Sequence, residues 1–258
     1  MRTLTSLPAL CAAFALTFGP ALPAAAATVA ADDVPALLKL ADHFRTGADA
    51  LQVETQVTTL AKDGSVDKER RYTVFTQSQR RSLVLMRSPS EAGQKVLMLG
   101  DDFWLLMPGS QRPLRITPSQ KLLGDASTGD IATLSWSDDY AGTLAGDGPC
   151  PVPDEARSCQ HLSLQATRKG VTYARIELWL GKARHEPVAA ELYVQSEKLA
   201  KRARFVLDKT GRQVDAMLLH DALAGGRETQ VRYLARMARA VPETWLNPMF
   251  LSRNPTLE

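Results

Sequence analysis

Residues that carry chemistry are scarce in this sequence. It has only 4 histidines and 3 cysteines among 258 residues, and no two of them stand at the short spacing of a metal site. It contains no G-x-S-x-G nucleophile elbow, no P-loop and no G-x-G-x-x-G motif. The adjacent carboxylates at 101–102 and 138–139 are interpreted as turn formers, because neighbouring residues on a strand point to opposite faces. The sequence therefore predicts no catalytic residue, no metal and no cofactor.

Neither sign of charge dominates. Lysine and arginine number 31, aspartate and glutamate number 28, and the net charge is +3. This balance argues against a nucleic-acid partner, which would require a strongly basic surface. The small basic clusters at 68–71 and 201–204 are expected to be solvated strand faces, and a basic binding surface is the alternative.

Beyond the N-terminus, no apolar stretch approaches the length of a membrane span. At the N-terminus, Arg2 is followed by an apolar stretch over 4–18 and by small residues up to Ala27, the order typical of a secretory signal peptide. A retained N-terminal anchor is the alternative. We expect cleavage near Ala27, leaving residues 1–27 as the signal peptide, a periplasmic location and a single domain over 28–258.

Export would leave one pair of cysteines. Cys11 lies inside the predicted signal peptide, whereas Cys150 and Cys159 bracket a proline-containing, loop-like segment. A single close pair in an exported chain predicts a disulfide between Cys150 and Cys159, which would clip a surface excursion between strands.

One helical pattern precedes a long region of period two. Apolar residues recur at helical spacing over 32–46. From Leu51 onward the chain reads as about eleven or twelve strands, separated by turn signals such as Asp63-Gly64. The stretch 124–148, rich in Gly, Asp, Ser and Thr, is expected to be an irregular loop that is functional or mobile. Because there is no βαβ alternation, the pattern predicts one large antiparallel sheet, curled or closed.

Three neighbouring predicted strands are apolar on both faces. Over 83–86, 96–99 and 103–107 no polar residue interrupts the run. An antiparallel sheet with one wet face would alternate, so both faces of these strands are expected to be covered, one by a helix and one by an apolar interior. The methionines in these runs suit a site that accepts flexible chains. An ordinary packed core is the alternative interpretation.

The sequence of these apolar strands resembles that of a known protein family. The run QKVLMLGDDFWLLMPG at 94–109, its continuation RPLRITPSQKLLGDA at 112–126, and the spacing from 129–131 to 138–140 are similar to the core motif of the outer-membrane lipoprotein-sorting proteins. The chain thus resembles the LolA/LolB-like superfamily of periplasmic lipoprotein carriers. The excursion between Cys150 and Cys159 has no place in that pattern, which leaves the cargo open.

The resemblance implies both a fold and a function. The fold is mainly β: an incomplete (half-open) antiparallel barrel of about eleven strands, with a few helices plugging one side and an apolar cavity between. The function is that of a non-enzymatic carrier, which holds acyl chains of lipoproteins or other lipids and passes them toward the outer membrane. Implied partners are these acyl chains, an inner-membrane transporter of the resistance-nodulation-division (RND) or ABC type and an outer-membrane acceptor. A monomer is expected.

Within that fold, the expected cavity side chains are Phe75, Leu85, Leu97, Leu99, Trp104 and Leu106, with Trp136 and Tyr140 on a gating loop. The choice of inward face is uncertain, because a shift of one residue exchanges the two faces of a strand. Arg112 and Arg115 follow a tight turn and are expected to contact a lipid headgroup or a partner, or else to pair locally with acids.

Two other functions stay open at this point. An accessory module that docks on an RND-type transporter without holding cargo would account for the long central loop and the apolar, proline-rich C-terminal segment. A hydrolase would rest on the scattered histidines, which are His43, His161, His185 and His220.

Overall fold

The structure is a computed structural model that describes residues 33–47, 49–117, 130, 135–153, 157–223 and 225–253. The predicted signal peptide, with its cleavage position near Ala27, lies outside the described residues. So do positions 118–129 and 131–134, which include part of the family motif.

One α-helix, thirteen strands and three short 3-10 helices make up the described chain. They follow in the order α1 (Val34–Arg45), β1 (Ala50–Leu60), β2 (Val66–Gln77), β3 (Arg81–Met86), η1 (Pro89–Glu91), β4 (Lys95–Leu99), β5 (Asp102–Leu106), β6 (Leu114–Ile116), β7 (Tyr140–Pro149), β8 (Ser158–Ala166), β9 (Arg175–Gly181), β10 (Pro187–Tyr193), β11 (Leu199–Leu207), β12 (Val214–Asp221), β13 (Glu228–Ala238), η3 (Glu243–Leu246) and η4 (Pro248–Phe250). Within the described ranges, no helix is both long and apolar enough to cross a membrane.

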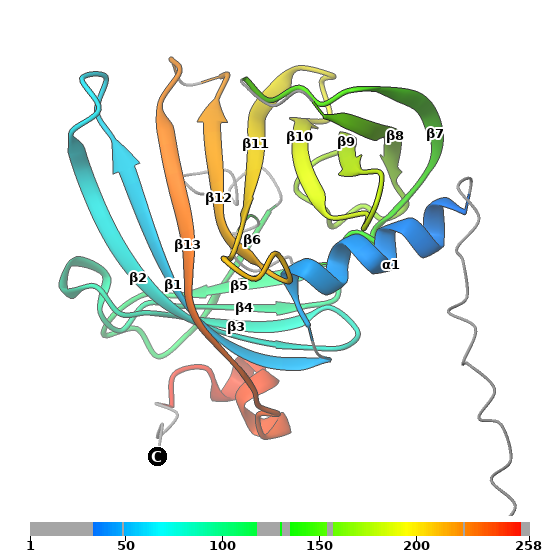
Figure 1. Cartoon of the computed structure of the whole chain (residues 1–258). Helices are drawn as coiled ribbons and strands as arrows, with labels where there is room; N and C mark the ends of the chain where they lie inside the picture. Colours follow the sequence, from blue (N-terminus) through cyan, green and yellow to red (C-terminus); the bar gives the residue numbers. More distant parts are fainter. Residues whose placement is uncertain are drawn as a thin grey trace, which may run out of the picture.

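All thirteen strands join in one antiparallel sheet that curls without closing (Figure 1). The strand order is β6-β5-β4-β3-β2-β1-β13-β12-β11-β10-β9-β8-β7, so most strands pair with their neighbours in sequence. The pairing of β1 with β13 departs from this order and joins the two halves of the chain. Because β6 and β7 stand at opposite ends of the order, the fold is the expected incomplete, half-open antiparallel barrel, with 13 strands instead of about eleven.

Helix α1 forms where the helical pattern predicts it. The carboxylate of Asp33 accepts a hydrogen bond from the backbone N–H of Ala36 at 3.1 Å, and proline occupies the first turn. The apolar stripe of the helix is buried against inward-facing residues of the sheet, through Val34, Leu37, Leu38 and Ala41. This burial, and not helix propensity alone, stabilises a helix of 12 residues.

Strands β2 to β5 are covered on both faces. Cross-strand pairing places Val74, Val84, Val96 and Leu105 on the concave face, and Phe75, Leu83, Leu97 and Trp104 on the outer face. The concave set packs in the same core as α1. The outer set packs under the C-terminal segment 241–253, which Figure 1 shows in red on the outer side of the sheet.

The stretch 124–148 is not irregular throughout, because β7 occupies about its last third. This strand pairs with β8 along its length, with a shift in register between Leu144 and Gly146. Its glycines and aspartate lower strand propensity and hide the strand in the sequence. An edge strand needs a partner on one side only, which lets such a sequence join the sheet.

The disulfide between Cys150 and Cys159 is present, as predicted. It links the end of β7 to the start of β8 and is buried with Val152, Val188 and Ala189. The bond therefore clips the β7–β8 connection at one edge of the sheet.

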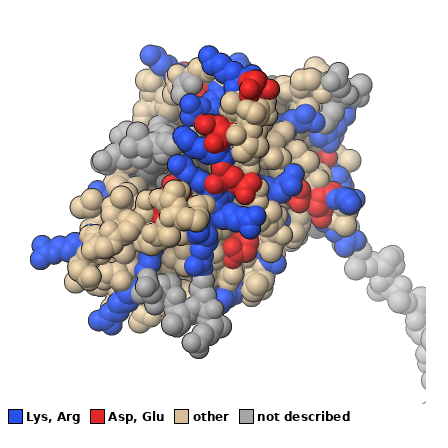
Figure 2. All heavy atoms as spheres, turned by 90° about the vertical axis from the view of Figure 1, so that its left-hand side faces the viewer, with Lys and Arg blue, Asp and Glu red and all other residues tan. Residues whose placement is uncertain are grey.

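The basic clusters divide between two environments. At 67–71, acidic and basic side chains alternate and form ion pairs such as Arg70–Glu91, and Figure 2 shows both signs of charge interspersed on this side of the molecule. At 201–204 the expectation of a solvated face is wrong for Lys201, which points inward and is 3% exposed. Its charge is compensated inside the barrel by Asp130.

Candidate functional site

The concave side of the sheet is the candidate site, and side chains fill most of it. The apolar residues of α1 and of the inward strand faces form one continuous core. The cavity left inside it measures only about 50 Å³. It is lined by Arg45, Asp130, Trp136, Tyr140, Val171, Thr172, Tyr173, Ile176, Leu192, Ala203, Phe205 and Met217. A ligand larger than a water molecule or two would have to displace some of these side chains.

Trp136 fills much of the space between the helix and the sheet. Its ring meets Phe205 of β11 edge to face, with 5.5 Å between ring centroids. The guanidinium of Arg45, at the end of α1, lies 3.9 Å from the centroid of the Trp136 ring. The indole is thus held between an aromatic ring of the sheet and a cation of the helix.

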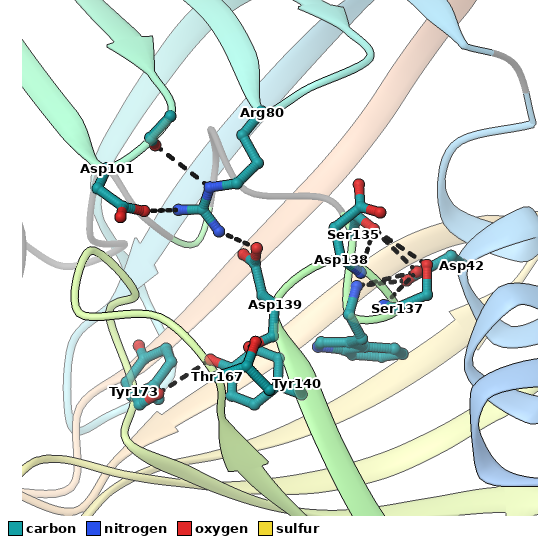
Figure 3. Close-up of polar contacts among 12 residues, drawn as sticks. Asp42, Arg80, Asp101, Ser135, Ser137, Asp138, Asp139, Tyr140, Thr167 and Tyr173 are labelled. Atoms are coloured by element: carbon teal, nitrogen blue, oxygen red, sulfur yellow. Dashed lines mark hydrogen bonds and ion pairs between the residues drawn. The ribbon is translucent and has the colours of Figure 1, made fainter.

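Asp42 of α1 fixes the backbone around Trp136. Its carboxylate accepts hydrogen bonds from the N–H of Trp136 at 2.8 Å, from the N–H of Ser137 at 2.8 Å and from the hydroxyl of Ser135 at 3.1 Å (Figure 3). Burial raises the pKa of this carboxyl, and the cation of Arg45 opposes the shift. The residues 135–140, called here the 135–140 segment, are therefore tied to the helix by the buried carboxylate of Asp42 as well as by Arg45.

A second buried contact ties the 135–140 segment to the sheet. Arg80 lies in the turn between β2 and β3 and pairs with the carboxylate of Asp139, while its Nε donates to the carbonyl of Gly100 at 3.2 Å (Figure 3). A further carboxylate, that of Asp101, lies 3.7 Å from the guanidinium. Arg80 and Asp139 are 7% and 1% exposed, so the pair is largely removed from water.

A third polar group lies deeper in the interior. Asp130 accepts a hydrogen bond from the hydroxyl of Tyr173 at 2.7 Å and pairs with Lys201 at 2.6 Å. Tyr140, the last residue of the 135–140 segment, donates its hydroxyl to the carbonyl of Tyr173 at 3.0 Å. Burial raises the pKa of the Tyr140 hydroxyl, which keeps it a neutral donor.

A polar cavity of about 470 Å³ adjoins two of these contacts. It lies between the end of α1, the β2–β3 turn and the 135–140 segment, and Asp42, Arg80 and Asp139 are among its lining residues. The side chains that hold the 135–140 segment therefore stand at the boundary between this cavity and the apolar core.

No nucleophile, base and orienting acid meet in the described part of the chain. His161 bonds to Glu177 at 2.8 Å, but the hydroxyl of Ser163 donates to the same glutamate instead of to the histidine. These three side chains lie on the outer face of β8 and β9, where the ring of His161 stacks on Trp179. The described residues also contain no cluster of three or more His, Cys, Asp or Glu side chains suited to a metal.

The predicted cavity side chains fall into two groups. Trp136 and Tyr140 belong to the concave core. Six others, Phe75, Leu85, Leu97, Leu99, Trp104 and Leu106, lie on the outer face and pack under the C-terminal segment. These six side chains therefore do not line the concave interior, contrary to the prediction. The runs they belong to are apolar on both faces, so their pattern could not show which face points inward. Ligand binding by any of the eight stays a prediction.

The two predicted headgroup arginines are exposed. Arg115 of β6 pairs with the carboxylate of Asp102 on the neighbouring strand, which is the local pairing considered as the alternative. Arg112 lies in the turn before β6, where its backbone N–H donates to the hydroxyl of Ser110 at 3.2 Å. Contact with a headgroup or partner stays a prediction for both.

Sequence reasoning missed the buried charges that organise the site. Asp42 and Arg80 were not singled out, Lys201 was expected on a solvated strand face, and Asp139 was interpreted as a turn former only. For Asp42 the sequence holds a partial signal of burial. It lies beside the apolar stripe of the helix, whereas a solvated residue would be expected on the opposite side of the helix. For Arg80 and Asp139 the sequence separation leaves no such signal.

Comparison with known proteins places this geometry in a family. A family model with the description "-like: Uncharacterized protein" matches residues 78–253, more than half of the chain. A LolA superfamily protein from Nitrosomonas europaea is 29% identical, with a TM-score of 0.72 over 82% of this chain and 96% of that one. The chain therefore belongs to the family of this model, and it shares its fold with this LolA superfamily protein.

Two more distant members of the comparison share the LolA-like fold. An outer membrane lipoprotein-sorting protein domain from Vibrio parahaemolyticus is 16% identical, with a TM-score of 0.66 over 85% of this chain and 98% of that one. A DUF1329 family protein from Desulfovibrio piger is 20% identical, with a TM-score of 0.65 over 84% of this chain and 98% of that one. Among curated proteins there is no significant match.

Proposed function

We propose that this LolA-like protein is a periplasmic, non-enzymatic carrier. In this proposal the concave interior of its half-open barrel receives acyl chains of lipoproteins or other lipids, and the protein passes them toward the outer membrane. The observation that carries the proposal is the way the apolar concave face is covered. A single described helix and the Trp136-bearing 135–140 segment close it, mainly through packing and a few polar contacts, and strand pairing contributes only at Tyr140, the first residue of β7.

Acyl transport requires an interior in which an acyl chain can replace the apolar side chains that pack it. Each methylene removed from water contributes about 0.8 kcal/mol, so an acyl chain does not cross an aqueous compartment unaided. Ligand pockets usually measure about 300–1,000 Å³. The 50 Å³ cavity is far smaller, so loading requires α1 and Trp136 to move away from the sheet. The incoming chain then replaces side chains of similar hydrophobicity.

The polar contacts suit such an exchange. Asp42 and the Arg80–Asp139 pair fix where the 135–140 segment rests, yet buried ion pairs contribute little net stability because desolvation offsets their attraction. These contacts fix the resting position of the 135–140 segment but add little net free energy that would oppose its movement. The proposed donor is an inner-membrane transporter of the RND or ABC type, and the proposed acceptor lies at the outer membrane. We propose that the carrier is a monomer formed by residues 28–258 after signal cleavage.

Native mass spectrometry of the protein purified from the periplasm, followed by lipid extraction, tests the proposal. We expect bound acyl species at near-stoichiometric levels. Met217→Trp should abolish them, because Met217 lines the interior cavity from β12 and a larger side chain would fill it. Leu218→Trp is the matched control, since the next residue of the same strand points outward.

The outcomes separate the carrier from the docking module. Loss of lipid in Met217→Trp, with retention in Leu218→Trp and unchanged far-UV circular dichroism in both, supports the carrier. A lipid-free mass with no uptake of added lipid contradicts it. If that lipid-free protein also co-purified with an RND-type transporter, the accessory docking function would replace the carrier function.

A further inference from the structure

A second cavity lies on the opposite face of the sheet, away from α1. It measures about 240 Å³, lies between β3, β4 and the C-terminal segment 241–253, and is partly open to solvent. Its lining residues are Leu83, Lys95, Thr244, Trp245, Phe250, Leu251 and Arg253. An engineered apolar cavity of about 150 Å³ can hold benzene, so this one has room for a small polar group on a short alkyl chain.

The C-terminal segment that roofs the cavity is held in a defined position. At its start the side-chain amide of Gln77 donates to the carbonyl of Val241 at 3.1 Å. Trp245 meets Phe75 of β2 edge to face, with 5.5 Å between ring centroids. One Nη of Arg81 lies 2.7 and 2.9 Å from the two carboxylate oxygens of Glu243. The roof thus belongs to the fold, and the cavity beneath it is a built feature.

The charge inside the cavity is positive, and none of the described lining residues supplies an anion. Lys95 is 5% exposed, and its ammonium donates to two neutral acceptors, the carbonyls of Leu251 and Arg253, each at 2.9 Å. No carboxylate stands among the described residues that line the cavity. Burial accordingly lowers the pKa of the Lys95 ammonium. A buried cation is costly unless an anion compensates it.

A second cation lies at the same cavity. The guanidinium of Arg253 lies over the ring of Phe250, 4.4 Å from its centroid, and both residues line the cavity. The remaining walls are aliphatic or aromatic, apart from Thr244. Two cations at an apolar cavity complement a ligand that joins an anionic group to an alkyl chain.

We propose that this outer cavity binds the anionic headgroup and first methylenes of a single-chain amphiphile, with Lys95 and Arg253 as the headgroup ligands. A carboxylate or a phosphate would supply the anionic group. The alkyl part would lie against Leu83, Trp245 and Leu251. This site is distinct from the concave interior, because the two cavities lie on opposite faces of the sheet and share no lining residue.

Calorimetric titration with octanoate tests the site. We expect saturable binding with one equivalent, and binding of 1-octanol weaker by at least about tenfold because it lacks the charge. Lys95→Gln and Arg253→Gln should each weaken octanoate binding by about tenfold or more, since each removes one charged donor. Octyl phosphate distinguishes the source: preference for octanoate indicates a free fatty acid, and preference for octyl phosphate indicates a phosphate-headed lipid. Either order supports the proposal.

Matched variants distinguish a blocked cavity from a disordered C-terminal segment. Thr244→Trp fills the cavity without removing a cation and should abolish binding, whereas Met249→Trp, on a residue of the same segment that does not line the cavity, should retain it. Met217→Trp, which blocks the concave interior, should leave octanoate binding unchanged. Equal binding of octanoate and octanol, or octanoate binding lost in Met217→Trp and kept in Thr244→Trp, would overturn the proposal.

Discussion

Replacing Arg80 with methionine tests whether the buried Arg80–Asp139 pair fixes the 135–140 segment. Methionine keeps an apolar stem and removes the guanidinium, which leaves the carboxylate of Asp139, 1% exposed, without its cation. Removing one partner of a buried ion pair typically costs about 3–5 kcal/mol. Because the adjoining polar cavity gives the carboxylate some access to water, we expect about 3 kcal/mol, the lower end of that range.

Urea denaturation followed by circular dichroism at neutral pH measures this loss. The double variant Arg80→Met with Asp139→Leu removes both charges and should recover most of the lost stability, because no unpaired charge stays buried.

Arg115→Met is the matched control for Arg80→Met. It removes an arginine from an exposed ion pair, in which Arg115 and Asp102 are 68% and 40% exposed. Exposed pairs contribute at most about 1 kcal/mol, so the control should change stability by less than that. The reasoning is refuted if Arg80→Met also costs under about 1 kcal/mol, or if the double variant is no more stable than the single one.

Four further changes test other parts of the fold. Serine at both Cys150 and Cys159 should lower the free energy of unfolding by about 2.5 kcal/mol, the loop entropy for a sequence separation of 9, as measured in urea with and without reductant. Trp136→Ala should cost about 3–5 kcal/mol and open the interior to a fluorescent apolar probe. Burial raises the pKa of Asp42 above 3.8. The contribution of Asp42 to folding stability is therefore fully present below its pKa in the unfolded state, and it is lost as the pH rises through its pKa in the folded state. Asp42→Asn should therefore gain stability relative to the wild type as the pH rises through that interval, as measured by urea denaturation. Arg81→Met should cost under about 1 kcal/mol in thermal unfolding, because its partner in the C-terminal segment is exposed.

Local patterns were enough to predict most of the elements. The helix over 34–45 follows from its apolar spacing and its aspartate cap, and the β1–β2 hairpin follows from Asp63-Gly64. Strand β7 was missed, because glycines and an aspartate weaken its pattern while pairing with β8 holds it in the sheet. Tertiary pairing thus overrode local propensity at this edge.

The site was harder to predict, for a reason that lies in β2 to β5. When both faces of a strand are apolar, composition no longer distinguishes the inside from the outside, and Leu97 or Trp104 could face either way. The inward face depends on pairing across the sheet and on what the C-terminal segment covers. The contact between Arg80 and Asp139 joins residues 59 positions apart, and no local pattern signals it.

The two covers of the sheet differ in how they are held, and this difference bears on which one opens. The C-terminal segment continues directly from β13 and packs a compact apolar cluster onto the outer face. Helix α1 and the 135–140 segment cover the concave face through Trp136 and through buried charges whose attraction is largely offset by desolvation. An acyl chain entering the concave side replaces apolar contacts with equivalent ones and disturbs polar contacts of small net value. In the proposed carrier, the concave cover would therefore be the one that cargo displaces at low cost, which is what a carrier that must also release its load requires.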